Sequence, residues 1–357
     1  MQKKIIALAI AGLASTAAFA QSNVTVYGVV DAAYVYTNSN GGTTVDVPGA
    51  AHGVDTSAIS SGGLAGSRIG FKGTEDLGNG LKAVFVLEYA LDIDGNFGVG
   101  SSASGLNARQ QFVGLSGKAG TLSLGRQYAP GYYTVAMDAT VASTPLSSVD
   151  AGQSFLGATI RASSPARWNN AVNFKSADFG GVSVQVIRGF GEIGNEMEAG
   201  ASTGVGVDYA AGPVAVKYVY HRAAFTQQAE AGMLDEHYLG ASFDAKVVKL
   251  FASAQTLDQG GIARAGGRAA EGSMYQFGAI VPVGKGNIHT TFSLADRNSS
   301  TRAATPYRGE QSSVSVVYTH GLSKRTTLYT GYRYTDQDVV NAGSILNAFG
   351  AGINHTF

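Results

Sequence analysis

Charged side chains stand at alternate positions of several apolar segments, a spacing that places them together on one face of an extended strand. Five cations have this spacing: Arg68, Lys72, Lys82, Arg109 and Arg126. They alternate with apolar residues that we take to face lipid, namely Ile69, Phe71, Leu81, Phe85 and Phe112. A cation facing hydrocarbon at mid-depth would cost about 2–4 kcal/mol, so we expect all five on the opposite face. Glu88 shares that face with Lys82.

The chain carries no motif of metal or nucleophilic chemistry. It contains no cysteine, no HExxH sequence and no pair of histidines at helical spacing, so we expect neither a metal site nor a cofactor. Serines are numerous, but none stands in a recognisable nucleophile motif. An enzyme barrel of lipase or protease type is an alternative that an esterase assay would separate from a non-catalytic protein. We expect no enzymatic activity.

Segments of about ten residues with alternating hydrophobicity recur along the chain and predict β-strands. The last segment, for example, places Phe349, Ile353 and Phe357 on one face and Gly350 and Asn354 on the other. Sixteen such strands are predicted, over residues 24–36, 67–76, 81–92, 109–116, 120–126, 169–176, 182–190, 203–209, 214–222, 236–243, 246–256, 272–281, 286–296, 311–319, 326–335 and 348–357.

The connections between these segments alternate in length. Short turns are predicted at 77–80, 117–119, 244–245 and 281–285. Long polar loops are predicted at 37–66, 93–108, 191–202, 223–235, 257–271 and 297–310. Short turns on one side and long loops on the other are typical of an all-β, sixteen-stranded antiparallel transmembrane barrel in an outer membrane. An even strand number places both termini on the short-turn, periplasmic side. A soluble β-rich adhesin is the alternative, which solubility without detergent would favour.

Residues 127–168 interrupt the pattern with about forty residues between two strands. A connection of that length inside one domain is normally functional. We expect this third loop to fold into the barrel and narrow it, bringing Asp138, Asp150, Arg161 and Arg167 into the passage. An unstructured external loop is the alternative.

The N-terminal residues predict an exported protein. Lys3 and Lys4 precede a short apolar run, and the sequence at 18–20 offers small residues for cleavage after Ala20, so residues 1–20 are expected to be a cleaved signal peptide. Residues 21–357 then form a single barrel domain. Without the leader, 23 basic residues face 25 acidic ones, which does not favour nucleic acid as a partner.

The chain resembles the general porins of β-proteobacteria, a trimeric, sixteen-stranded group of Gram-negative outer-membrane channels. The matching stretches cover most strands in order and are VTVYGVVDAAYVY at 24–36, GSRIGFKGTEDLGNGLKAVFVLEY at 66–89, RQQFVGLSGKAGTLSLGRQY at 109–128, NNAVNFKSADFGGVSVQ at 169–185, HGLSKRTTLYTGYRYT at 320–335 and FGAGINHTF at 349–357. The long loops, which set solute preference, match less closely.

This resemblance implies several partners and roles. The protein would be a homotrimer in outer-membrane lipid and lipopolysaccharide, passing small hydrophilic solutes by passive diffusion. Phe357, a terminal aromatic on the lipid face, would be the signal that the barrel-assembly machinery reads. A basic cluster on the wall, with Arg68 and Arg109 in matching motifs and Arg167 beside one, would face acids of the inserted loop. Asp138 and Asp150 are the candidate acids.

The charges of this expected constriction indicate a weak preference for anions. The wall carries Arg68, Lys72, Lys82, Arg109 and Arg126 against Glu88, while the loop balances Asp138 and Asp150 against Arg161 and Arg167. Basic rings in a narrow passage favour anions, because a low-dielectric wall focuses the field of its lining groups. A solute-specific channel with a binding site in the constriction is the alternative, which saturable conductance would favour.

Overall fold

The computed structural model describes residues 23–40, 55–95, 107–140, 144–192, 200–224, 233–260, 271–298, 308–339 and 343–357. The predicted signal peptide at residues 1–20 lies outside them. Within the described residues, no helix is long and apolar enough to cross a membrane.

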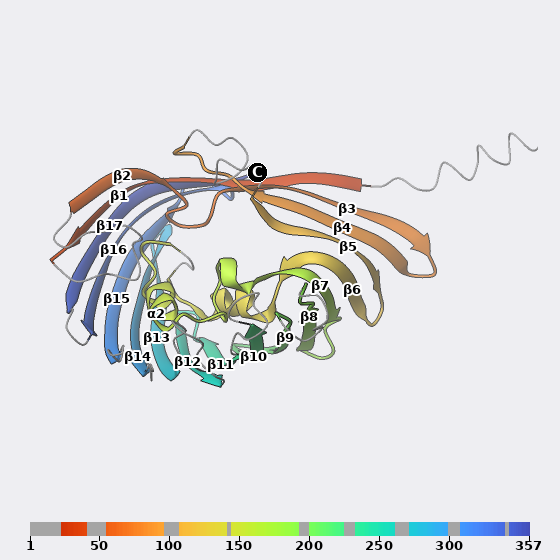
Figure 1. The fold of residues 1–357 in the computed structure, drawn as a ribbon. Helices are drawn as coiled ribbons and strands as arrows, with labels where there is room; N and C mark the ends of the chain where they lie inside the picture. Colours follow the sequence, from red (N-terminus) through yellow and green to blue (C-terminus); the bar gives the residue numbers. More distant parts are fainter. Residues whose placement is uncertain are drawn as a thin grey trace, which may run out of the picture.

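The described strands form one antiparallel sheet that closes on itself (Figure 1). Its strands are β1 (Asn23–Ser39), β2 (Asp55–Ser61), β3 (Arg68–Gly78), β4 (Leu81–Ala90), β5 (Ala108–Gly117), β6 (Gly120–Tyr128), β7 (Arg167–Ser176), β8 (Val182–Gly189), β9 (Ser202–Ala211), β10 (Val214–Ala224), β11 (Met233–Asp244), β12 (Lys249–Gly260), β13 (Glu271–Val283), β14 (Gly286–Asn298), β15 (Arg308–Gly321), β16 (Thr326–Val339) and β17 (Ser344–Thr356). Closure pairs β1 with β17.

Two of these strands share one position in the barrel. β2 pairs with residues 32–38 of β1, whereas β3 pairs with residues 23–29. Together they occupy the position of a single interrupted strand, so the barrel has the sixteen predicted strand positions. The prediction of a long loop over 37–66 is wrong in part, because it includes the end of β1 and all of β2. The sequence of β2, DTSAISS, lacks the alternation that marks the other strands.

Side chains alternate between the two faces of the barrel wall. Val113, Leu124 and Phe277 lie on the outer face, each more than half exposed. The inner face of β13 and β14 carries buried polar residues such as Gln276 and Ser293. Closure pairs the edge strands with each other, so neither edge leaves its hydrogen-bonding groups open to hydrocarbon.

The short turns gather at one end of the barrel, together with both ends of the described chain. At the turn between β3 and β4, Asn79 and Gly80 have φ of 53° and 78°, the conformation that Asn-Gly pairs adopt in tight hairpins. Gly28 and Phe357 exchange backbone hydrogen bonds at this end, with N···O distances of 3.1 and 3.2 Å. A Cβ on Gly28 would lie 2.4 Å from the Phe357 ring, so glycine is required where the terminal aromatic packs.

The described residues of the third loop, 129–140 and 144–166, lie inside the barrel, as predicted (Figure 1). They include the 3-10 helices η1 (Pro130–Met137) and η2 (Ser164–Ala166) and the α-helix α2 (Ser148–Leu156). Ser147 caps α2 by accepting a hydrogen bond from the Asp150 N–H at 3.0 Å, and Gly157 ends it with φ of 74°.

The third loop builds a small apolar core against the inner wall. Phe155 and Leu156 of α2 are fully buried against Leu234, Met274 and neighbouring apolar residues of β11–β14. This burial is the reason the loop does not extend into solvent: its apolar side chains leave water only when they pack on the wall.

Candidate pore constriction

Glu88 on β4 is the centre of a charged cluster on the inner wall. Its Oε1 accepts hydrogen bonds from Arg109 Nε at 2.8 Å and from the Tyr128 hydroxyl at 2.5 Å. Its Oε2 accepts a hydrogen bond from the Tyr27 hydroxyl at 3.0 Å and lies 3.8 Å from Arg68 Nε. The carboxylate is almost completely buried. Two arginines therefore neutralise this carboxylate and two tyrosine hydroxyls donate to it. These contacts in turn hold the side chains of Arg68 and Arg109 in position.

Two tyrosines connect this cluster to the third loop. Tyr132 of η1 stacks on Tyr128 with ring centroids 3.7 Å apart, and its hydroxyl accepts a hydrogen bond from Arg109 Nη2 at 2.7 Å. The guanidinium of Arg167 lies 5.6 Å from the centre of the Tyr132 ring. The loop thus meets the wall where Arg68, Arg109 and Arg167 are gathered.

A β-bulge brings Arg109 into this cluster. Gln110 pairs with Glu88 and Ala108 pairs with Tyr89, so Arg109 is the extra residue between them. A bulge of this kind turns the additional side chain away from the regular alternation. The expectation that Phe112 faces lipid is wrong: it pairs with Val86 and lines an inner pocket with Lys82, while Val113 is exposed outside. Strict alternation would therefore point Arg109 outward.

The structure does not bring every expected residue into the cluster. The expectation that Arg126 faces the interior is wrong: it follows the alternation of the outward-facing Leu122 and Leu124, and its guanidinium donates to the backbone oxygens of Ala108 and Arg167. Lys72 and Lys82 face the interior but lie nearer the short-turn end, where they line a separate pocket.

The two loop acids lie apart from the arginine cluster. Asp138 accepts hydrogen bonds from Thr140 and lies within hydrogen-bonding distance of Ser147 and Thr291, on the β14 side of the barrel. Burial raises the pKa of Asp138 to about 7. Asp150 forms a two-bond ion pair with Arg161 of the same loop, at 2.7 and 2.9 Å. The acid that faces the basic cluster is Glu88 of the wall itself.

Sequence reasoning missed the aromatic and basic residues that complete this wall. Tyr27, Tyr128 and Tyr132 hold the cluster, and Lys175 places its Nζ 4.8 Å from the centre of the Tyr133 ring. Lys217 forms an ion pair with Asp208. Lys175 and Lys217 each stand at an inward-facing position of a predicted strand, and this alternation could have placed both on the inner wall. Nothing in the sequence of the loop distinguishes Tyr132.

Asp31 was also missed, although it organises the break between β2 and β3. Its carboxylate accepts hydrogen bonds from the N–H groups of Gly63, Leu64 and Ala65, from the Tyr329 hydroxyl and from Asn354 Nδ2. These bonds turn residues 62–67 inward at the seam where the barrel closes. Arg68 follows directly and donates from Nη1 to the Gly66 oxygen at 2.8 Å, so the turn also positions that arginine.

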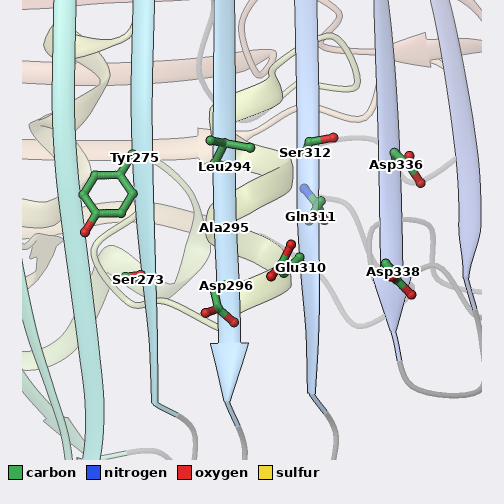
Figure 2. Close-up of a pocket in the computed structure, with 10 residues that line it drawn as sticks. All are labelled: Ser273, Tyr275, Leu294, Ala295, Asp296, Glu310, Gln311, Ser312, Asp336 and Asp338. Carbon is green, nitrogen blue, oxygen red and sulfur yellow. The ribbon is translucent and has the colours of Figure 1, made fainter.

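A pocket of about 390 Å³ lies on the outer face of the barrel, away from the passage (Figure 2). Tyr275 and Leu294, which line it, are exposed and alternate with the buried Met274 and Ala295. Four carboxylates border it near the long-loop ends of β14–β16: Asp296, Glu310, Asp336 and Asp338. No grouping of ligands suited to a metal ion occurs among the residues that the structure describes. Because it lies on the outer face, the pocket plays no part in the constriction.

Comparisons with known proteins agree with this geometry. Residues 7–339 match the family model described as Gram-negative porin. Outer membrane porin protein 32 of Delftia acidovorans is 32% identical over 92% of this chain and 88% of its own length. An outer membrane porin protein of Bordetella pertussis is 28% identical over the full length of both chains.

Solved structures show the same barrel. The anion-selective porin from Comamonas acidovorans superposes with a TM-score of 0.72 at 27% identity, covering 94% of this chain and all of the other. OmpT of Vibrio cholerae, solved in a trimer form, has a TM-score of 0.68 at 14% identity over 94% of this chain and 99% of its own. With its closed barrel and its inserted third loop, this chain belongs to the Gram-negative porin family and forms a channel in the outer membrane.

Proposed function

We propose that this porin is a passive diffusion channel for small hydrophilic solutes with a weak preference for anions. The observation that carries the proposal is an imbalance between unpaired cations and unpaired acids on the described inner wall of β3–β10. Glu88 and Asp208 are each engaged by a cation, which leaves Asp76 as the unpaired inward-facing acid of these strands. Lys72, Lys82 and Lys175 have no carboxylate within ion-pair distance among the described residues.

The field at the narrow section is consequently positive. Two arginines share one carboxylate at Glu88, and Arg167 adds a third cation above Tyr132. In a passage with low-dielectric walls such an excess favours anions. The relative from Comamonas acidovorans, which is described as anion-selective, supports this direction.

The test is the zero-current potential of the purified channel in a salt gradient. The wild type is expected to pass chloride better than potassium. Arg68→Glu or Arg109→Glu should lower the anion-to-cation permeability ratio by about fivefold, since each replaces a positive by a negative charge close to the ion path. The shift should shrink between 0.1 and 1 M salt, as the Debye length falls from about 10 Å to about 3 Å. A wild type that passes potassium several-fold better would refute the proposal.

We also propose that the channel is a homotrimer in outer-membrane lipid and lipopolysaccharide, inserted by the barrel-assembly machinery through the segment ending in Phe357, and without enzymatic activity. Small outward-facing residues on the terminal strands, such as Ala32 and Ala351, permit close packing between copies. The trimeric state of the OmpT structure supports this assembly. Chemical cross-linking in mild detergent should give a trimer; monomers alone would contradict it.

A further inference from the structure

A second pocket lies inside the barrel, between the short turns and the charged cluster. It has a volume of about 610 Å³ and is lined by residues of β1 and β3–β6. That volume falls within the range of small-molecule sites, roughly 300–1,000 Å³. The pocket is separate from the Glu88 cluster, since none of Glu88, Arg68 and Arg109 lines it.

The floor of this pocket is apolar, which is unusual on the wall of a water-filled channel. The strand register turns Val84, Val86 and Phe112 inward, because Val86 pairs with Phe112 and both neighbours of Phe112 in the chain face outward. All three side chains are only partly buried, so part of their surface remains in contact with water. Apolar surface left in water is a source of free energy for any solute that covers it.

Two lysines stand over that floor. Lys72 and Lys82 both line the pocket, and both are exposed. Lys72 Nζ lies 5.1 Å from the centre of the Tyr27 ring. The one acid of the lining, Asp76, accepts a hydrogen bond from the Gly78 N–H and forms no ion pair among the described residues. The lining therefore carries one more positive than negative charge.

We propose that this pocket binds organic anions that join a carboxylate to an apolar body, such as aromatic carboxylates, on their way through the channel. The carboxylate would lie against Lys72 and Lys82 and the apolar body against Val84, Val86 and Phe112. Small inorganic anions would pass without binding, because they cannot cover the apolar floor. This inference rests on the proposed anion preference and names the solutes that benefit from it.

The experiment measures block of the chloride current in planar bilayers by benzoate, acetate and benzamide. Benzoate should block saturably, with acetate and the neutral benzamide each at least about fivefold weaker, since each lacks one of the two kinds of contact. Phe112→Thr should weaken benzoate block by about fivefold while leaving block by acetate unchanged. Val84→Thr, which keeps the side-chain shape, should act in the same direction and guards against misfolding of the first variant.

Matched lysine variants separate this pocket from the general field. Lys82→Gln should weaken benzoate block, whereas Lys175→Gln, which removes a cation outside the pocket, should not. Equal block by benzoate and acetate, or unchanged block in both Phe112→Thr and Val84→Thr, would overturn the inference. The zero-current potential in potassium chloride reads the proposed function independently: a cation-selective wild type whose benzoate block still depends on Phe112 would reject the anion preference and keep the pocket.

Discussion

The two halves of the inner wall use similar residues for different purposes. On β3–β10 the inward-facing cations exceed the acids that neutralise them. On β11–β16 two arginines bind the third loop: Arg297 donates to the Phe155 oxygen at 2.9 Å and Arg333 to the Ser147 oxygen at 3.3 Å, at opposite ends of α2. One half therefore carries an excess of inward-facing positive charge, and the other anchors both ends of α2 to the wall.

The two glutamates that are buried among the described residues show the same division. Glu88 accepts hydrogen bonds from Arg109 and two tyrosines of the wall. Glu236 on β11 accepts hydrogen bonds from the backbone N–H groups of Thr159 and Ile160, at 2.6 and 3.0 Å. A buried carboxylate of the wall can thus bind either a cation or the backbone of the loop, and only its partners in the structure show which.

The largest effect on the channel should follow removal of the part of the third loop that β11–β16 anchor. Deleting residues 140–160 takes away α2 and the loop contacts of Glu236, and single-channel conductance should rise because the loop no longer occupies the passage. The anion preference should persist in direction, since the cations of β3–β10 remain. Unchanged conductance would mean that the loop does not limit the current. Heat-modifiable migration on gels serves as the control for an intact barrel.

A matched pair of substitutions compares the two halves directly. Glu88→Gln removes the negative charge that two arginines share, so the anion-to-cation permeability ratio should rise by about twofold. Glu236→Gln should leave that ratio near the wild-type value and instead increase current noise, because the loop loses charge-assisted hydrogen bonds. Zero-current potentials and noise spectra of the two variants, recorded in the same salts, test the division; equal shifts in selectivity would remove it.

The smallest effect on the channel concerns the pH dependence of loop anchoring. The pKa of Asp138 is raised to about 7, above the ordinary value near 3.9, so the folded protein favours the protonated carboxyl. The contribution of Asp138 to stability is therefore greatest below about pH 4, declines as the pH rises from about 4 to about 7, and is constant above that.

Thermal unfolding in detergent measures this dependence. The Tm of the wild type minus the Tm of Asp138→Asn should decrease as the pH rises from 4 to 7. Above pH 7 this difference should stay constant. Asp150→Asn is the control, because the carboxylate of Asp150 forms an ion pair with Arg161 and its negative charge stabilises the loop. A difference in Tm that does not change with pH would show that Asp138 is ionised in the folded barrel throughout.

The amino-acid sequence by itself determined the barrel and much of its charged lining. Alternation and turn spacing located the sixteen strand positions, because a side-chain period of two is a local property of each strand. The same alternation assigned Lys72, Lys82 and Glu88 to the inner face, where the structure has them. The oversized connection at 127–168 indicated a loop inside the barrel before any contact was known.

Only the tertiary structure decided the constriction itself. The bulge that turns Arg109 inward depends on the register between β4 and β5, and so does the inward position of Phe112. The partners of Asp31, Asp138 and Glu236 include groups far away in the sequence, and no local pattern marks them. Alternation fixes the face of a side chain only while the ladder stays regular; where a bulge or a buried loop intervenes, pairing between distant segments determines what each charge contacts.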